Sequence, residues 1–127
     1  MENKFEIEIK TKLRVTQEDI DDIMCAALEG GITYWCNRAQ VVGEYLGEYG
    51  HEQIAKGGTL KLYDAEDDNV YELTQDKLLN GIKLAYEKGY RKDYGWCDGH
   101  YLDTCQVDAD VADIIIQLAL FGDVIYG

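Results

Sequence analysis

The sequence contains no proline and no serine. Without proline, the 13 glycines are the residues left to break helices and strands sharply. Without serine, a covalent mechanism would need cysteine or threonine as its nucleophile, with His51 or His100 as the base, and no nucleophile-turn motif accompanies them. The glycine-rich motifs that bind phosphate groups and dinucleotides are also missing. We therefore expect a protein that is not an enzyme and that uses no cofactor.

Basic residues are scarce as well. The chain has 25 aspartates and glutamates against 12 lysines and arginines, which gives a formal net charge of −13. A surface this negative repels phosphate backbones and anionic lipids, so we expect neither direct nucleic-acid binding nor docking on a membrane. The charge suits a protein that presents acids to a basic partner, and it equally suits one whose acids only keep it soluble.

Long apolar runs are absent too. None reaches the length of a membrane span, and the opening "MENKFEIEIK" has no apolar signal region. We therefore expect a cytoplasmic location, where the four cysteines would be reduced thiols.

What the chain does contain is hydrophobic periodicity, over a length of 127 residues that suits one domain. Apolar side chains at positions 5, 7, 9, 13 and 15 predict a strand with one buried face. Thr16 and Asp19 predict the start of a helix whose apolar stripe covers 20–28. We expect the glycines at 30–31 to end this helix by a left-handed turn.

The stretch 32–57 is the hardest to interpret. The aromatic and β-branched residues of 32–36 favour a strand that enters the core, and "HEQIAKGG" suits a short helical turn. Beyond it, "TLKLYD" and "NVYEL" flank "AEDD", which predicts a β-hairpin with Leu60 and Leu62 on one face.

Two further helices are predicted in the second half. One begins at Thr74 and ends at Gly89, and its inward residues are expected to be Leu78, Leu79, Ile82, Ala85 and Tyr86. The other begins at Asp108 or Asp110, runs to Gly122 and is apolar nearly all round, while "DVIYG" after it suits a short edge strand. The fold class that we expect is a single α+β domain over 1–127, in which a small, mainly antiparallel sheet packs against two to three helices.

Two stretches carry side chains that metals bind. Cys97, His100 and Cys105 offer the sulfur and nitrogen ligands that zinc prefers, and Cys36 could supply a fourth. Cys36 has no close partner in the sequence, however, so separate thiols are the alternative interpretation and no metal is favoured. "DAEDDN" at 64–69 lacks the glycine and the distal glutamate of a calcium loop, so we interpret it as an acidic hairpin tip.

Aromatic residues are plentiful, with ten tyrosines and two tryptophans. Several gather around 90–106, a stretch without periodicity, and Tyr and Trp are favoured on recognition surfaces. Arg38 is notable as the only base between Arg14 and Lys56. The candidate partner-binding residues are Trp35, Arg38, Tyr94, Trp96, Asp98, Tyr101 and Asp103. The alternatives are that these aromatics pin the loop to the core and that Trp35 is itself a core residue.

Three stretches of the sequence are similar to a known group of proteins: "TQEDIDDIMCAALEGGITYWCNRAQVVGEYLGEY", "GGTLKLYDAEDDNVYELT" and "DADVADIIIQLALFGDVIYG". Together they resemble small acidic proteins encoded in bacteriophages and prophages of Gram-positive gut bacteria. The resemblance spans most of the chain and fails mainly at 90–101. It implies a context, since phage accessory genes of this size often encode proteins that block host defences or redirect host machinery, and it supplies no catalytic residues.

Three functions follow as hypotheses. The first is an inhibitor of a host defence or nucleic-acid-handling complex, similar to an anti-CRISPR protein, whose acidic surface mimics nucleic acid and whose Tyr94, Trp96 and Tyr101 anchor the contact. The second is a sponge for a small nucleotide signal of host defence, with a base stacked on Trp35 or Trp96. The third is a structural or assembly protein that works as a homo-oligomer, for example a homodimer, joined through its apolar last helix and "DVIYG".

Overall fold

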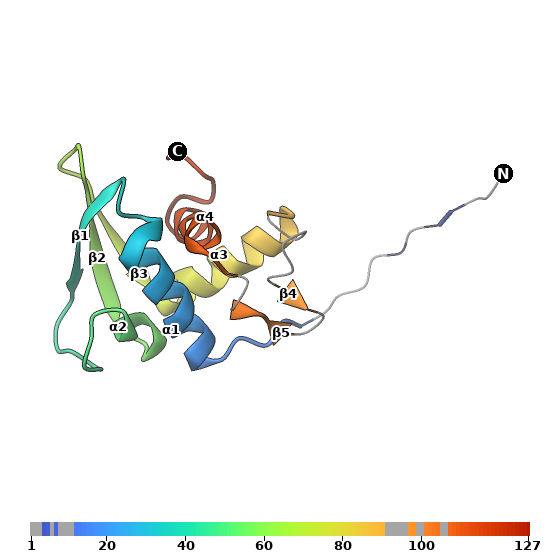
Figure 1. The fold of residues 1–127 in the computed structure, drawn as a ribbon, viewed down its shortest axis with the longest axis horizontal. Coiled ribbons are helices and arrows are strands. Elements are labelled where there is room, and N and C mark those ends of the chain that lie inside the picture. Colours follow the sequence, from blue (N-terminus) through green and yellow to red (C-terminus); the bar gives the residue numbers. More distant parts are fainter. Residues whose placement is uncertain (1–3, 6, 8–11, 91–96, 99–100, 105–106) are drawn as a thin grey trace.

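The computed structural model describes residues 4–5, 7, 12–90, 97–98, 101–104 and 107–127. An antiparallel sheet with strand order β1-β2-β3 packs against helices, and a short two-stranded sheet, β4-β5, lies on the far side of the helices. Figure 1 shows this succession of layers, with the main sheet at one end of the domain. The expected α+β fold class is thereby confirmed.

The main sheet contains the predicted hairpin. Strands β2 (Thr59–Asp64) and β3 (Val70–Thr74) pair antiparallel, and β1 (Cys36–Val41) pairs with the other edge of β2. Cys36 pairs with Asp64 and Arg38 with Tyr63, so the residue between them, Asn37, forms a β-bulge. Leu60 and Leu62 are buried on one face, as the alternation predicts.

Helix α1 (Gln17–Ala26) begins as its sequence predicts. The hydroxyl of Thr16 accepts a hydrogen bond from the Asp19 amide, and the Asp19 carboxylate accepts one from the Thr16 amide. This reciprocal capping satisfies two amides that the first helical turn leaves without partners. Ile23 and Met24 from the predicted stripe are fully buried.

The end of this first helix differs from the prediction. The chain continues as a single π-helical turn, η1 (Ala27–Gly31), and neither Gly30 nor Gly31 has a positive φ. Gly31 is needed for close approach instead, because a Cβ there would lie 2.6 Å from the carbonyl oxygen of Ala109. Gly30 has open space around it. The left-handed turn expected at 30–31 was therefore wrong.

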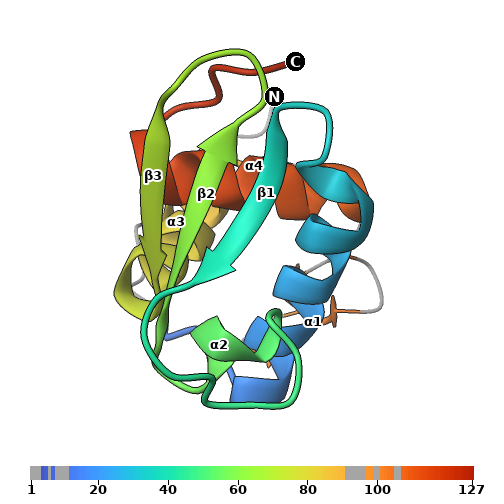
Figure 2. The same cartoon turned by 90° about the vertical axis from the view of Figure 1, so that its left-hand side faces the viewer.

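Three more helices occur in the described part of the chain: α2 (Glu52–Ala55), α3 (Gln75–Glu87) and α4 (Ala109–Phe121). Thr74 and Asp108 cap the two long ones through their side chains, and Gly89 and Gly122 follow their ends with positive φ, as predicted. Helix α4 runs behind the sheet (Figure 2) and is buried along most of its length. Gly81 lets α3 pack closely, since a Cβ there would lie 2.5 Å from the carbonyl oxygen of Ile115.

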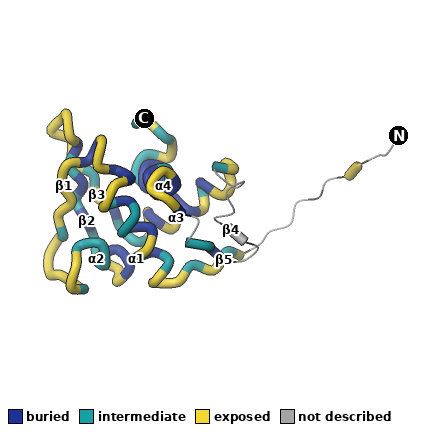
Figure 3. The backbone as a smooth tube through the Cα atoms, in the orientation of Figure 1, coloured by how far each residue is buried: buried dark blue, intermediate teal, exposed yellow. Residues whose placement is uncertain are grey.

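The burial pattern in Figure 3 places the core between the sheet and the helices. On α3, Leu78, Ile82 and Ala85 are buried as predicted, but Leu79 and Tyr86 are exposed. Among the described residues, no helix combines the length and the apolar character that crossing a membrane requires.

Three of the strand predictions were wrong in the described residues. Phe5 and Ile7, expected on a buried face, are exposed and belong to no strand, although Leu13 and Val15 do pack against the core. Residues 32–35 form a turn, so β1 begins only at Cys36. The closing segment 123–127 is not a strand.

The two adjacent glycines of η1 offer a matched test of the packing. Gly31→Ala should lower the free energy of unfolding by about 1–3 kcal/mol, because the added methyl group must push η1 away from the α4 backbone. Gly30→Ala should leave it unchanged or raise it by up to about 1 kcal/mol, since alanine restricts the unfolded chain. Urea unfolding of both variants checks this, and equal effects would contradict the close approach.

Candidate protein-binding surface

One face of the main sheet is open. In Figure 2 the three strands lie in front of α3 and α4, and no described helix covers their outer side. Alternation along β2 directs Leu60, Leu62 and Asp64 inward and leaves Lys61 and Tyr63 half-buried on the outer face. Most of β1 is exposed. A partner could therefore reach this face without any rearrangement of the described elements.

Arg38 lies on this open face and is held there by an aromatic neighbour. Its guanidinium carbon lies 5.1 Å from the centre of the Tyr63 ring, within the range of a cation–π contact. The Tyr63 hydroxyl donates a 2.6 Å hydrogen bond to Oε1 of Gln40. The bulge at Asn37 sets the register that puts Arg38 opposite Tyr63. Arg38 is thus an ordered surface residue.

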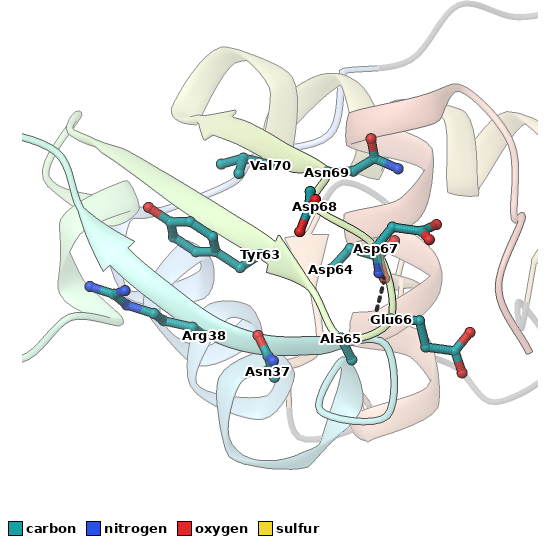
Figure 4. A pocket seen from close by; sticks show the side chains of 10 residues that line it. All are labelled: Asn37, Arg38, Tyr63, Asp64, Ala65, Glu66, Asp67, Asp68, Asn69 and Val70. Atoms are coloured by element: carbon teal, nitrogen blue, oxygen red, sulfur yellow. Dashed lines mark hydrogen bonds between the residues drawn. The ribbon is translucent and has the colours of Figure 1, made fainter.

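Beside Arg38, the hairpin tip forms one wall of a shallow hollow (Figure 4). Asn37 and Arg38 of β1, Tyr63 of β2 and the hairpin residues 64–70 line it. Residues 65–70 are all exposed, and three of them are acids: Glu66, Asp67 and Asp68. Because the lining contains one base and several carboxylates, the hollow repels phosphate groups and suits a basic ligand or protein side chain.

Asp64 is an acid of this hairpin that serves the fold. It is buried; its Oδ1 accepts hydrogen bonds from the amides of Glu66, at 2.9 Å, and Asp67, at 3.3 Å. Its Oδ2 accepts a 2.5 Å hydrogen bond from the Tyr126 hydroxyl. That hydroxyl and, next, the Glu66 amide hold the pKa of Asp64 below its usual value. The carboxylate therefore fixes the hairpin tip and connects it to the closing segment of the chain.

Trp35 is a core residue, so its selection as a partner-binding candidate was wrong and the alternative interpretation is confirmed. It is 3% exposed, and Tyr126 stacks on it with ring centres 4.8 Å apart and planes within 1° of parallel. Phe121 and Tyr71 meet the indole edge-on. The sequence hypothesis that a nucleobase stacks on Trp35 loses its platform, because Tyr126 already occupies that place.

A buried polar pair on α4, which the sequence reasoning missed, holds this aromatic cluster. Asp113 accepts hydrogen bonds from the Trp35 indole at 2.8 Å, the Tyr34 hydroxyl at 2.6 Å and the Gln117 amide at 2.9 Å. Gln117 is fully buried, and its Oε1 accepts from the backbone amides of Ile125 and Tyr126, both at 2.8 Å. The signal was present in the sequence as two polar residues, four apart, in a helix whose only other polar residue is Asp110.

Tyr34 completes the network at its outer end. Desolvation of its hydroxyl, together with the hydrogen bond to Asp113, raises the pKa of Tyr34 to about 12. The hydroxyl therefore remains a donor at neutral pH. Every buried side-chain nitrogen and oxygen atom in the described part of the chain has a hydrogen-bond partner, so these polar groups are structural and none is left aimed at a ligand.

The remaining candidate residues lie in or near the segment 90–106. Tyr94 and Trp96 fall outside the described residues. Asp98 belongs to β4 (Cys97–Asp98) and Tyr101 to β5 (Tyr101–Leu102), while Asp103 is half-buried. The neighbouring Thr104 hydroxyl donates to Asp22 of α1 at 2.9 Å, which connects Thr104 to the first helix.

The zinc hypothesis loses its proposed fourth ligand. Strands β1 and β4 lie on opposite sides of the helices in Figure 1, so Cys36 is far from Cys97. Burial raises the pKa of the Cys36 thiol, and its Sγ donates to the Arg38 carbonyl oxygen at 3.3 Å. His100 and Cys105 lie outside the described residues. Among the side chains that the structure describes, no three histidines, cysteines or acids are grouped as metal ligands.

Comparison with known proteins adds no relative: no family model, no curated protein and no solved structure matches this chain.

The Asp64–Tyr126 bond predicts a specific pH dependence. Because the folded-state pKa of Asp64 lies below the unfolded value, its ionised form stabilises the fold above about pH 4, and this contribution disappears as the pH falls through the folded value. Asp64→Asn should therefore lower the melting temperature clearly at pH 7, and the difference from wild type should shrink toward pH 3. Calorimetry across this range checks it, and a difference that stays constant with pH would count against the carboxylate's role.

Proposed function

We propose that this protein acts by binding, as an accessory inhibitor of a host defence or nucleic-acid-handling complex, and that its acidic hairpin enters a basic groove of that complex. The observation that carries the proposal is the exposed acidic hairpin tip beside an open sheet face. The site of action would be the cytoplasm of the host cell. The resemblance to small acidic phage proteins supports the same context.

The hairpin presents its charge in a fixed arrangement. Glu66, Asp67 and Asp68 are exposed, while the backbone of the first two is held by Asp64. Because this backbone is already ordered, little conformational entropy is lost when a partner binds. The net charge of −13 adds long-range attraction toward a basic groove and speeds the encounter.

The two alternative functions lose observations on which they were based. A nucleotide sponge needs a stacking platform and bases for the phosphates, but Trp35 is buried and Arg38 is the one base lining the hollow. Trp96, the other platform considered, lies outside the described residues. Assembly through the last helix needs an apolar face that the chain leaves open, but Ile115, Ile116 and Leu118 of α4 are buried within the monomer. Of the "DVIYG" segment, the other part of this hypothesis, Ile125 is exposed.

The test compares two variants that remove the same amount of charge. In the hairpin variant, Glu66→Gln, Asp67→Asn and Asp68→Asn are combined. In the control, Glu18→Gln, Glu29→Gln and Glu87→Gln remove three exposed acids from the helical part of the molecule. Each protein is immobilised and exposed to lysate of a Gram-positive host, with and without added double-stranded DNA.

We expect wild type and the control to capture a nuclease or nucleoprotein subunit, and added DNA or salt to release it. The hairpin variant should bind about tenfold more weakly, since three contact charges at roughly 0.5 kcal/mol each amount to one decade. Equal capture by both variants, or capture that DNA and salt do not affect, would refute nucleic-acid mimicry by the hairpin.

A further inference from the structure

A second surface lies at the other end of β1, in the loop 42–51 that leads to α2. Its sequence repeats Gly-Glu-Tyr at 43–45 and 47–49. Tyr45 is 65% exposed and Tyr49 is 57% exposed, and Val42 and Leu46 are exposed as well. Large apolar side chains gathered in this way on one loop are typical of an interaction site, whereas single exposed ones are ordinary.

The loop backbone is held in place by one buried side chain. Gln53 is 2% exposed; its Oε1 accepts from the Leu46 amide at 3.0 Å, and its Nε2 donates to the Glu44 carbonyl at 3.1 Å. A Cβ at Gly47 would lie 2.7 Å from the Cβ of Glu52, so the loop passes close to α2 at this glycine. The exposed side chains therefore project from an ordered backbone.

Helix α2 is itself anchored, which makes it a firm base for the loop. Ile54 and Ala55 are buried in the core, and their carbonyl oxygens accept hydrogen bonds from the side chains of Gln75 and, for Ala55, also Gln17. At the loop's end, His51 stacks on Tyr49 and its Nδ1 lies 2.7 Å from Oδ1 of Asp21 on α1. Tyrosines on a rigid support give large contact area at a low entropic cost.

The charge around these tyrosines selects the partner. Glu44 and Glu48 are exposed within the loop, Glu52 follows it, and no lysine or arginine occurs between Arg38 and Lys56. We infer that this loop is a second binding site, one that inserts Tyr45 and Leu46 into an apolar pocket or stripe bordered by lysines or arginines on a partner protein. The acids would pair with those bases at the rim while the apolar side chains bury the central area.

A second copy of the chain does not fit this description. Another copy brings a net charge of −13 of its own, so two such loops or surfaces repel each other. The loop and the acidic hairpin lie at opposite ends of β1. The loop follows Val41 at one end, whereas the hairpin follows Asp64, which pairs with Cys36 at the other end.

The test uses a probe of the stated chemistry: a synthetic amphipathic helix of leucines and lysines, titrated into the labelled protein and followed by amide chemical shifts. We expect the shifts that move to belong to 42–52. Tyr45→Ala with Leu46→Ala should weaken binding at least about tenfold, as loss of a hot-spot pair does. Glu44→Gln with Glu48→Gln should weaken it less and reduce its salt dependence.

Ile125→Ala is the matched control, because Ile125 is also an exposed apolar residue but lies outside the loop. It should bind the probe like wild type, and the amide spectra of all variants show whether they remain folded. Three results would overturn the inference: no binding of the probe, shifts confined to the hairpin 65–69, or equal affinity of the Tyr45/Leu46 variant and the control. Sedimentation that reveals a dimer lost in the Tyr45/Leu46 variant would overturn it in favour of self-association.

Discussion

The arrangement of this protein depends on a carboxylate and an amide buried in an apolar helix. Asp113 and Gln117 lie four residues apart on α4, which packs against the inner side of the sheet. Asp113 fixes the turn before β1 by accepting from Tyr34 and Trp35, and Gln117 fixes the segment after α4 by accepting from Ile125 and Tyr126. Burying such groups is costly unless their hydrogen bonds are made. Here the donors to Asp113 include two residues distant in sequence, and the donors to Gln117 come from the segment that follows the helix.

Both candidate binding surfaces are connected to that pair. Trp35, held by Asp113, leads directly into β1, and Tyr126, held by Gln117, donates to the Asp64 carboxylate that orders the acidic hairpin. Strand β1 places Arg38 beside the hollow near one end, and the loop 42–51 follows its other end. An acidic tip and an acid-rimmed apolar loop at the two ends of one strand suit a partner with an extended basic surface, and both are ordered before binding.

The sequence predicts the parts of this fold that local chemistry decides. The caps at Thr16, Thr74 and Asp108 and the hairpin around 65–69 follow from nearby residues, and the structure has them.

The predictions that failed depend on distant contacts. Residues 32–35 have a strand-like composition but form a turn that brings Tyr34 and Trp35 to Asp113. Glycine is required at position 31 because the Ala109 backbone lies close to it, not because the helix ends there. Period-two alternation at 5–15 predicts one apolar and one polar face, but it does not show whether another part of the chain packs on the apolar face. In the structure Phe5 and Ile7 are exposed. For the site, charge alone singled out Arg38, but its place over Tyr63 needs the β1–β2 register, which no local pattern encodes.

The most direct test of this account is Gln117→Met, which keeps the side-chain volume and removes the amide. The free energy of unfolding should fall by about 2–4 kcal/mol, since Asp113 loses a donor and two backbone amides lose their acceptor. Hydrogen exchange should show that Ile125 and Tyr126 lose protection while the β2–β3 amides keep theirs. A free energy within about 0.5 kcal/mol of wild type, with unchanged protection at 125–126, would contradict the central role of the buried pair.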